Sequence, residues 1–416
     1  MTVRDFLEAH RFRDENLDRE ELISAFDAEI EAKLAGRASS LALLPSTLPA
    51  DGDVRTDEPA LVVDAGGTNL RVAAVTLPSD GSAPRFEHVV RRPMPGTHGE
   101  LGADAFHRAI ADVVSEVAAK APSARRLGYC FSYAFESTPD HDARLLAWAK
   151  NVAAPEVVGQ LVGSELLKRT TATVGRSVVL NDTVATLLAG KARGCGRRFG
   201  GYLGFILGTG TNTACVEKGE VLNAESGEFN RLERSAFDLA FDATTVDPGK
   251  AVFEKMISGA YLGGVGLTVL KAAARDGLFG AAAAAAVDGL AGLSTVQLDA
   301  FATDPAAAEN PLGAVFAAES DRTLARELSV AVFRRAAVLT AVHLAAFVRR
   351  CPKTAPGEPI LVTVDGSTYY KTRAVPFDLL VRAELDALAA ARGWAYEIVR
   401  VDEAPMVGAA VAALTD

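Results

Sequence analysis

The sequence predicts a two-domain α/β fold in which mixed sheets are flanked by helices. Two hairpins of the same design support this prediction, one at residues 61–75 and one at residues 202–216. The elements around the first hairpin follow the order β-β-β-α-β, which is typical of a mixed sheet covered by helices. With 416 residues, the chain also exceeds the usual size of a single hydrophobic core, so two domains are expected.

The elements are predicted in chain order from hydrophobic spacing and turn residues. Residues 3–34 favour helices, and residues 45–59 are rich in turn residues and predict a connector. Strands are expected at residues 61–63, 72–75, 86–90, 127–133 and from 178, and helices at residues 103–119 and 155–169. The alanine-rich run 280–287 favours a surface helix or loop, and a last helix is expected near residues 408–414.

The first hairpin has the composition of a phosphate-binding turn. Its two strands are apolar and partly β-branched, and the turn between them holds Gly66, Gly67, Thr68 and Asn69. Glycines without Cβ atoms let the backbone approach a phosphate closely, and the short polar side chains supply further contacts. Asp64, at the end of the first strand, is placed to hold a hydrated Mg²⁺. Taken alone, the segment is also compatible with an ordinary hairpin.

The second hairpin repeats this design with Thr209, Gly210 and Asn212 in and after its turn. Between the hairpins, Asn181 and Asp182 follow an apolar strand and precede a helix-compatible run, with Asp182 or Thr183 as the expected N-cap. An acid at a strand end beside two phosphate-binding hairpins indicates phosphoryl transfer. A purely capping role for Asp182 is the alternative, and the two roles are compatible.

The composition narrows the classes of partner. A hydrophobic fraction of 49% and a charged fraction of 23% are those of an ordinary globular protein. The net charge of −10 and the lack of a basic stripe argue against a nucleic-acid partner. The N-terminus carries charges where a signal peptide needs an apolar stretch, and no long uncharged apolar run indicates a membrane span. The cysteines, Cys130, Cys195, Cys215 and Cys351, form no CxxC pair, so a reducing cytoplasm is expected.

These segments, in this order, resemble the hexokinase family, including its glucokinases. The resemblance covers nearly the whole chain, and residues 253–264 form its most specific part. The matching segments are residues 39–45, 131–132, 148–150, 180–183, 208–212, 223–227, 248–249, 253–259 and 364–367. The resemblance implies one kinase unit in the ribonuclease-H-like fold shared with actin. It implies a large domain of residues 1–58 and 182–407 and a small domain of residues 59–181 and 408–416.

The resemblance also implies a reaction and its residues: Mg-ATP phosphorylates a hexose, glucose above all, at the 6-hydroxyl, as in the first step of glycolysis. Asp182 is the implied general base, and Lys150 is a further catalytic residue. The implied sugar-binding residues are Ser132, Lys150, Asn181, Asp182, Asn212, Glu225 and Glu254. Because they come from both proposed domains, closure is expected to complete the site.

For the nucleotide, the resemblance implies a second set of residues. The phosphates are expected at Asp64, Gly66, Gly67, Thr68, Asn69, Thr209 and Gly210, and the nucleoside near Gly259, Gly366 and Ser367. Asp64 is expected to contact Mg²⁺ through water. Arg71 either contributes charge here or is an ordinary exposed strand arginine.

The sequence departs from the family pattern at both substrates. Ala149, Tyr133 and Ser226 replace a threonine, a phenylalanine and a tryptophan near the expected sugar pocket, so another hexose or broad tolerance is possible. Ala404, Pro405 and Met406 replace a Gly-Ser-Gly turn before the last helix, and proline removes an amide donor. ATP is the favoured donor, with other nucleotides or polyphosphate as alternatives.

Two other functions are open at this point. A non-catalytic sugar sensor on the same scaffold is the main alternative, because a fold alone does not fix an activity. A filament-forming or chaperone-like ATPase of the same fold superfamily is the other, although it gives Glu225 and Glu254 no role.

Overall fold

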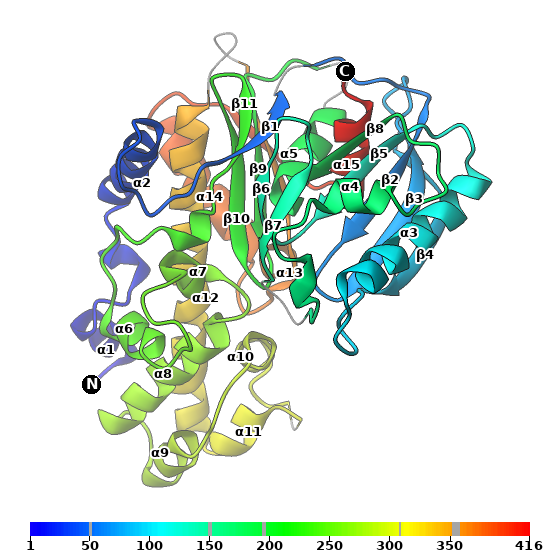
Figure 1. Ribbon diagram of the computed structural model, residues 1–416. Helices are drawn as coiled ribbons and strands as arrows, with labels where there is room; N and C mark the ends of the chain where they lie inside the picture. Colours follow the sequence, from blue (N-terminus) through cyan, green and yellow to red (C-terminus); the bar gives the residue numbers. More distant parts are fainter. Residues whose placement is uncertain (50–51, 149–151, 194–196, 308, 352–357) are drawn as a thin grey trace.

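A computed structural model of the chain describes residues 1–49, 52–148, 152–193, 197–307, 309–351 and 358–416. Its two main sheets lie on either side of a pair of helices, α5 (Asp182–Arg193) and α15 (Ala404–Leu414), as Figure 1 shows. Further helices cover the outer face of each sheet. The chain is therefore a layered α/β structure with mixed sheets, as the sequence predicted.

The five-stranded sheet has the order β4-β3-β2-β5-β8. Its first three strands are antiparallel, and β5 and β8 are parallel to β2. The strands are β2 (Pro59–Ala65), β3 (Asn69–Thr76), β4 (Arg85–Pro93), β5 (Arg126–Phe131) and β8 (Arg176–Leu180).

The six-stranded sheet has the order β1-β11-β10-β9-β12-β13. The strands from β1 to β9 are antiparallel in turn, and β12 and β13 are parallel to β9. The strands are β1 (Leu44–Pro49), β9 (Gly201–Leu207), β10 (Thr211–Glu217), β11 (Glu220–Asn223), β12 (Ile360–Asp365) and β13 (Tyr396–Val399).

The two sheets repeat one arrangement. In each, a three-stranded antiparallel meander is followed by two strands parallel to the first strand of the meander, and β1 is an addition at the β11 edge. The predicted second instance of the hairpin-led unit is thereby confirmed. This duplicated arrangement is that of the ribonuclease-H-like fold.

Burial on both sheet faces explains the continuous apolar strands. In β2, Ala60 and Val62 face the central helices, whereas Leu61 and Val63 face the outer layer of α3 (Ala103–Lys120) and α4 (Val162–Leu167). The outer face of the six-stranded sheet packs mainly on α2 (Arg19–Leu34), α12 (Glu319–Arg350) and α14 (Phe377–Ala390).

The other elements lie at the periphery of this layered core. The helices are α1 (Val3–Ala9), α6 (Ala236–Asp242), α7 (Val252–Ile257), α8 (Leu262–Arg275), α9 (Ala281–Asp288), α10 (Thr295–Thr303), α11 (Pro311–Val315) and α13 (Ser367–Lys371). Three short 3₁₀ turns and a small hairpin complete the described elements: η1 (Asp14–Asn16), η2 (Pro155–Val157), η3 (Ser226–Glu228), β6 (Ala134–Ser137) and β7 (Ala143–Ala147).

Three local predictions were wrong. The start of the expected connector, residues 45–49, belongs to strand β1, which pairs with β11 at the sheet edge, where prolines are tolerated. The helix expected over residues 155–169 is two shorter pieces, η2 and α4. The cap of α5 is Asn181, whose Oδ1 accepts a hydrogen bond from the Thr183 amide at 2.8 Å, rather than Asp182 or Thr183.

Helix α12 is, among the described residues, the one helix long and apolar enough to cross a membrane. However, 83% of its apolar window is buried within the protein. It contributes residues such as Phe333 and Leu339 to the core beneath the six-stranded sheet. Packing inside the fold therefore accounts for its composition.

Candidate active site

Asp182 lies where the two halves of the molecule meet. It begins α5 directly after β8 and is partly buried. Burial raises the pKa values of Asp64, Glu225 and Asp365, and the charge of Asp182 contributes to the rise at each of them. These acids come from different elements of both sheets. Asp182 is therefore central to a converging group of carboxylates.

A hydrogen-bonded cluster lies on the side of the six-stranded sheet. The Nδ2 atoms of Asn223 and Asn212 donate to Glu225 Oε1 at 2.7 and 3.3 Å, and Asn212 Nδ2 also donates to Asn223 Oδ1 at 2.8 Å. Glu225 has a left-handed backbone with φ of 50°. This conformation is energetically unfavourable for any residue that has a Cβ atom. The cluster brings Asn212 and Glu225 together, as predicted, and adds Asn223.

Glu254 lies beside this cluster. Its Oε2 accepts a hydrogen bond from the Thr211 amide at 2.8 Å. Burial raises the pKa of Glu254, and the charge of Glu225 adds to that rise. The segment after β11 and the start of α7 therefore present two carboxylates, Glu225 and Glu254, to the same region.

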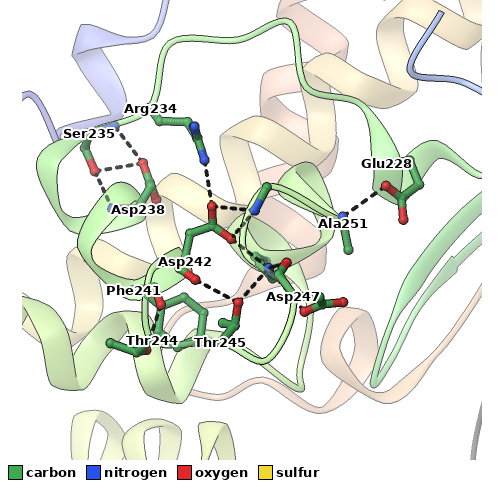
Figure 2. A network of polar contacts seen from close by, with 12 residues as sticks. Glu228, Arg234, Ser235, Asp238, Phe241, Asp242, Thr244, Thr245, Asp247 and Ala251 are labelled. Atoms are coloured by element: carbon green, nitrogen blue, oxygen red, sulfur yellow. Dashed lines mark hydrogen bonds and ion pairs between the residues drawn. The ribbon is translucent and has the colours of Figure 1, made fainter.

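A buried polar network fixes the loop between α6 and α7, and Figure 2 shows its acids and hydroxyls around Asp242. The Lys255 ammonium, only 3% exposed, donates to Asp242 Oδ1 at 2.7 Å, to Thr245 Oγ1 at 2.9 Å and to the Asp247 carbonyl at 2.8 Å. At the loop's end, the Ala251 amide donates to Glu228 Oε2 at 3.0 Å. Because Glu254 is the neighbour of Lys255, this network holds the helix turn that carries Glu254.

Ser226 is turned away from the expected sugar pocket. Its side chain is fully buried, and its hydroxyl donates to Thr213 Oγ1 at 3.1 Å. Thr213 in turn contacts Nε2 of His343 on α12 at 3.1 Å. Burial lowers the pKa of His343 to about 3, so this histidine is neutral at ordinary pH. The residue in the family's tryptophan position therefore supports the core beneath the site.

Tyr133 also packs into the protein. It is 4% exposed and packs edge-on against Trp148, and its hydroxyl donates to the Gly66 carbonyl at 2.6 Å. The neighbouring Ser132 amide donates to the Ala65 carbonyl at 3.2 Å. Tyr133 thus supports the first hairpin, and Ser132 lies next to the end of β2.

The first hairpin leaves Thr68 and Asn69 exposed at its tip, with Gly66 and Gly67 beside them. At its base, Asp64 Oδ2 accepts hydrogen bonds from Arg71, with Nε at 2.7 Å and Nη2 at 2.5 Å. Arg71 also pairs with Glu403 at the start of α15. Arg71 is therefore a half-buried, doubly paired residue and not an ordinary exposed strand arginine.

The second hairpin packs against the segments predicted for the nucleoside. The Gly208 carbonyl accepts hydrogen bonds from the Gly259 amide at 2.8 Å and from Thr368 Oγ1 at 2.7 Å, and the Thr209 carbonyl accepts one from the Ala260 amide at 2.9 Å. A Cβ atom on Gly366 would lie 2.2 Å from the Leu207 carbonyl oxygen. Thr209, Gly210, Gly259, Gly366 and Ser367 therefore lie in adjoining loops.

The residues present fit a divalent cation held mainly by a substrate. Among the described residues, no group of three or more histidines, cysteines or acids forms a metal cage. The separate acids Asp64, Asp182 and Asp365 nevertheless give the region a negative charge, which contributes to the raised pKa values of Asp64 and Asp365. Mg²⁺ in phosphoryl-transfer sites typically binds one or two carboxylates, water and phosphate oxygens.

Two residues near the expected sugar pocket, Lys150 and Ala149, lie outside the described residues. Three residues of the observed site, Asp365, Asn223 and Glu403, had no predicted role. Asp365 could have been found, because it is an acid at the end of an apolar strand and close before a glycine, as Asp64 is in the first hairpin. The left-handed Glu403 carries no such pattern.

Comparison with known proteins identifies the family. Two models described as hexokinase match the chain, one over residues 2–192 and the other over residues 202–415. Hexokinase-1 of Schizosaccharomyces pombe is 27% identical, in an alignment that covers 93% of this chain and 85% of that protein. Hexokinase-1 of Spinacia oleracea is 33% identical over 62% of this chain, and the alignment spans 57% of that protein's length.

A solved structure gives the same result for the fold. The hexokinase of Schistosoma mansoni, solved in complex with glucose, aligns over 99% of this chain and 100% of its own. The TM-score is 0.74, with 24% sequence identity. The matches to the family models include the segments 208–212 and 253–259, on which the resemblance was based. The chain therefore belongs to the hexokinase family.

Proposed function

We propose that this protein transfers the terminal phosphoryl group of Mg-ATP to the 6-hydroxyl of a hexose, with glucose as the expected sugar and Asp182 as the general base. Membership of the hexokinase family makes the chain a hexose kinase. The convergence of Asp182 with Glu225, Asp64 and Asp365, whose raised pKa values its charge contributes to, is the observation that carries the proposal.

The cluster around Glu225 supports binding of a polyol. A sugar hydroxyl donates one hydrogen bond and accepts others, and carboxylates and amides at one place satisfy both needs. Asn212 on β10, Glu225 after β11 and Glu254 on α7 supply these groups. Ser132 and Asn181 are proposed to add contacts from the five-stranded sheet, together with Lys150.

The chemical step then follows from the acids and hairpins. Asp182 would accept the proton of the 6-hydroxyl as the hydroxyl oxygen attacks the terminal phosphorus, and the diphosphate leaves. Residues 66–69 and 209–210 would hold the phosphates through backbone amides and short polar side chains. Mg²⁺, when bound, neutralises charge on the transferred and leaving groups, with Asp64 holding it through water.

Domain closure belongs to the same proposal. The proposed sugar-binding residues come from the two sheets, so a bound sugar would draw them together and exclude water from the transfer. We also propose that the protein acts in the cytoplasm. The free, buried thiols of Cys130, Cys215 and Cys351 are compatible with a reducing compartment.

The experiment that tests the function measures ADP release from Mg-ATP with glucose, mannose, fructose, glucosamine or no sugar. Asp182→Asn is expected to lower the sugar-dependent turnover number by about 10²- to 10⁴-fold, because it removes the proton acceptor. Asp112→Asn, on the exposed side of α3, is the matched control and should keep full activity. Turnover that survives in Asp182→Asn would contradict the role of Asp182, and sugar binding without turnover in the native protein would favour a sensor.

A further inference from the structure

A chain of ion pairs runs from the predicted phosphate hairpin to the protein surface. Arg71 binds Asp64 on one side and Glu403 on the other. Glu403 Oε1 lies 3.5 Å from Nη2 of a second arginine, Arg91 on β4. Side-chain exposure increases along the series, from 8% at Asp64 and 23% at Arg71 to 36% at Glu403 and 68% at Arg91.

The two arginines are neighbours by strand pairing. Arg71 and Arg91 are directly opposite partners in the antiparallel β3–β4 ladder, so their side chains lie on the same face of the sheet. Two like charges side by side repel, and the Glu403 carboxylate between them relieves that repulsion. Glu403 has a left-handed backbone with φ of 55°, an uncommon conformation for a glutamate.

The start of α15 offers little to an anion by itself. Pro405 has no amide hydrogen, and the amides of Met406 and Val407 donate to the Glu403 carbonyl at 2.9 and 3.0 Å. Ala404, Met406 and Val407 are also buried. An anion beside the hairpin would therefore meet the arginine side chains and not the helix amides.

We propose that Glu403 is a displaceable counter-ion of the donor site, and that a bound polyphosphate chain takes its place at Arg91. The inference rests on the proposed function and deepens it, because it assigns Arg91 and Glu403 to recognition of the phosphate donor. Without a donor, the single Glu403 carboxylate lies against both guanidinium groups, and Asp64 is a second partner of Arg71. A polyphosphate chain carries several negative charges and makes stronger charge-assisted hydrogen bonds to Arg91 than one partly exposed carboxylate does.

The exchange predicts opposite effects for the two residues. Removing the charge of Glu403 removes a competitor of the donor, so donor affinity should rise. Removing the Arg91 guanidinium removes a contact that the donor makes, so donor affinity should fall. Sugar affinity should change in neither variant, because neither Arg91 nor Glu403 is among the proposed sugar-binding residues.

Calorimetric titration of the whole protein with Mg-ATP and, separately, with Mg-tripolyphosphate tests the inference. Arg91→Ala is expected to weaken binding of both ligands about three- to tenfold, and Glu403→Gln to tighten it about two- to fivefold. Arg92→Ala is the matched control, because the adjacent Arg92 lies 3.5 Å from Glu116 and is similarly exposed at 54%. Glucose titrations and melting temperatures of the same variants check the sugar site and folding.

The inference is overturned if Arg91→Ala binds both ligands as Arg92→Ala does, or if Glu403→Gln weakens binding. An effect of Arg91→Ala on Mg-ATP alone would also overturn it, because the contact would then be to the nucleoside. Binding shifts as expected, in a protein that transfers phosphate to no sugar, would support the inference and contradict the proposed function alone.

Discussion

Glu225 and Glu254 are carboxylates whose burial opposes their ionisation. Burial raises the pKa values of both, although Asn223 and the Thr211 amide donate hydrogen bonds that favour the charged forms. At neutral pH the folded protein therefore holds two carboxylates that would ionise more easily in the unfolded chain. Such an arrangement is typical of binding sites, where the polar ligand supplies the missing hydrogen bonds.

Glu225→Gln is expected to raise the melting temperature of the sugar-free protein and to weaken sugar binding. A raised carboxyl pKa means that the folded state binds the proton more tightly, so the free energy of unfolding falls as pH rises from about 4.5 through the raised pKa. The gain in melting temperature should therefore be present at pH 8 and absent at pH 4. Loss of the charged acceptor should weaken glucose binding by about 10- to 100-fold.

Scanning calorimetry at both pH values and glucose titration measure these effects. Glu220→Gln, on the preceding strand β11, is the control and should change neither quantity. A lower melting temperature for Glu225→Gln at pH 8 would show that the hydrogen bonds from Asn212 and Asn223 outweigh burial.

At the scale of elements, the proposed nucleotide site is formed by loops whose backbones are in direct contact. The turn of the second hairpin meets the end of β12, and Gly366 has φ of +120° beside the Leu207 carbonyl. A side chain at this position would meet both a steric clash and an unfavourable backbone conformation. The glycine in residues 364–367 is thus required by the approach of two loops that are more than 150 residues apart in the chain.

Gly366→Ala is expected to lower the free energy of unfolding by about 2–4 kcal/mol and to raise the KM for Mg-ATP. Gly208→Ala is the matched control in the facing loop, because its added Cβ would make only ordinary contacts at 3.6 Å or more. Its unfolding free energy should stay within about 1 kcal/mol of the native value. Urea denaturation gives the comparison, and equal losses in both variants would refute the packing argument.

At the scale of the whole molecule, α5 and α15 join the two sheets. A Cβ atom on Gly408 of α15 would lie 1.8 Å from the Ala185 carbonyl oxygen of α5, so the two helix backbones are in direct contact. The central core includes residues of both sheets and both helices. We propose that the halves of the molecule rotate about this helix pair when a sugar binds.

Closure predicts a smaller radius of gyration with glucose than without it, measured by small-angle X-ray scattering on the whole protein. Glu225→Gln, at the same glucose concentration, should keep the radius of the sugar-free protein because its affinity is reduced. An unchanged radius in the native protein at saturating glucose would rule out closure of this kind.

The fold class, the two hairpins and the acid after β8 could all be predicted from the amino-acid sequence. These features depend on local rules: apolar runs form strands, glycines form tight turns, and acids at strand ends lie at the edge of a sheet. The positions of Asp64 and Asp182 at strand ends, and of the turn at residues 208–210, could therefore be predicted from local pattern alone. The family resemblance added Glu225 and Glu254 to the predicted sugar-binding residues. The sequence around each of them has no local pattern that would indicate a binding site.

Which of these groups lie together depends on the tertiary structure. Glu403 pairs with Arg71 across more than 300 residues, Tyr133 supports the first hairpin, and Ser226 packs into the core, because long-range packing and not local sequence sets these contacts. The strand at residues 44–49 was likewise missed, since its pairing partner β11 lies far along the chain. Local sequence propensity determines the helices and strands. The candidate site is determined by contacts between segments that are distant in the sequence.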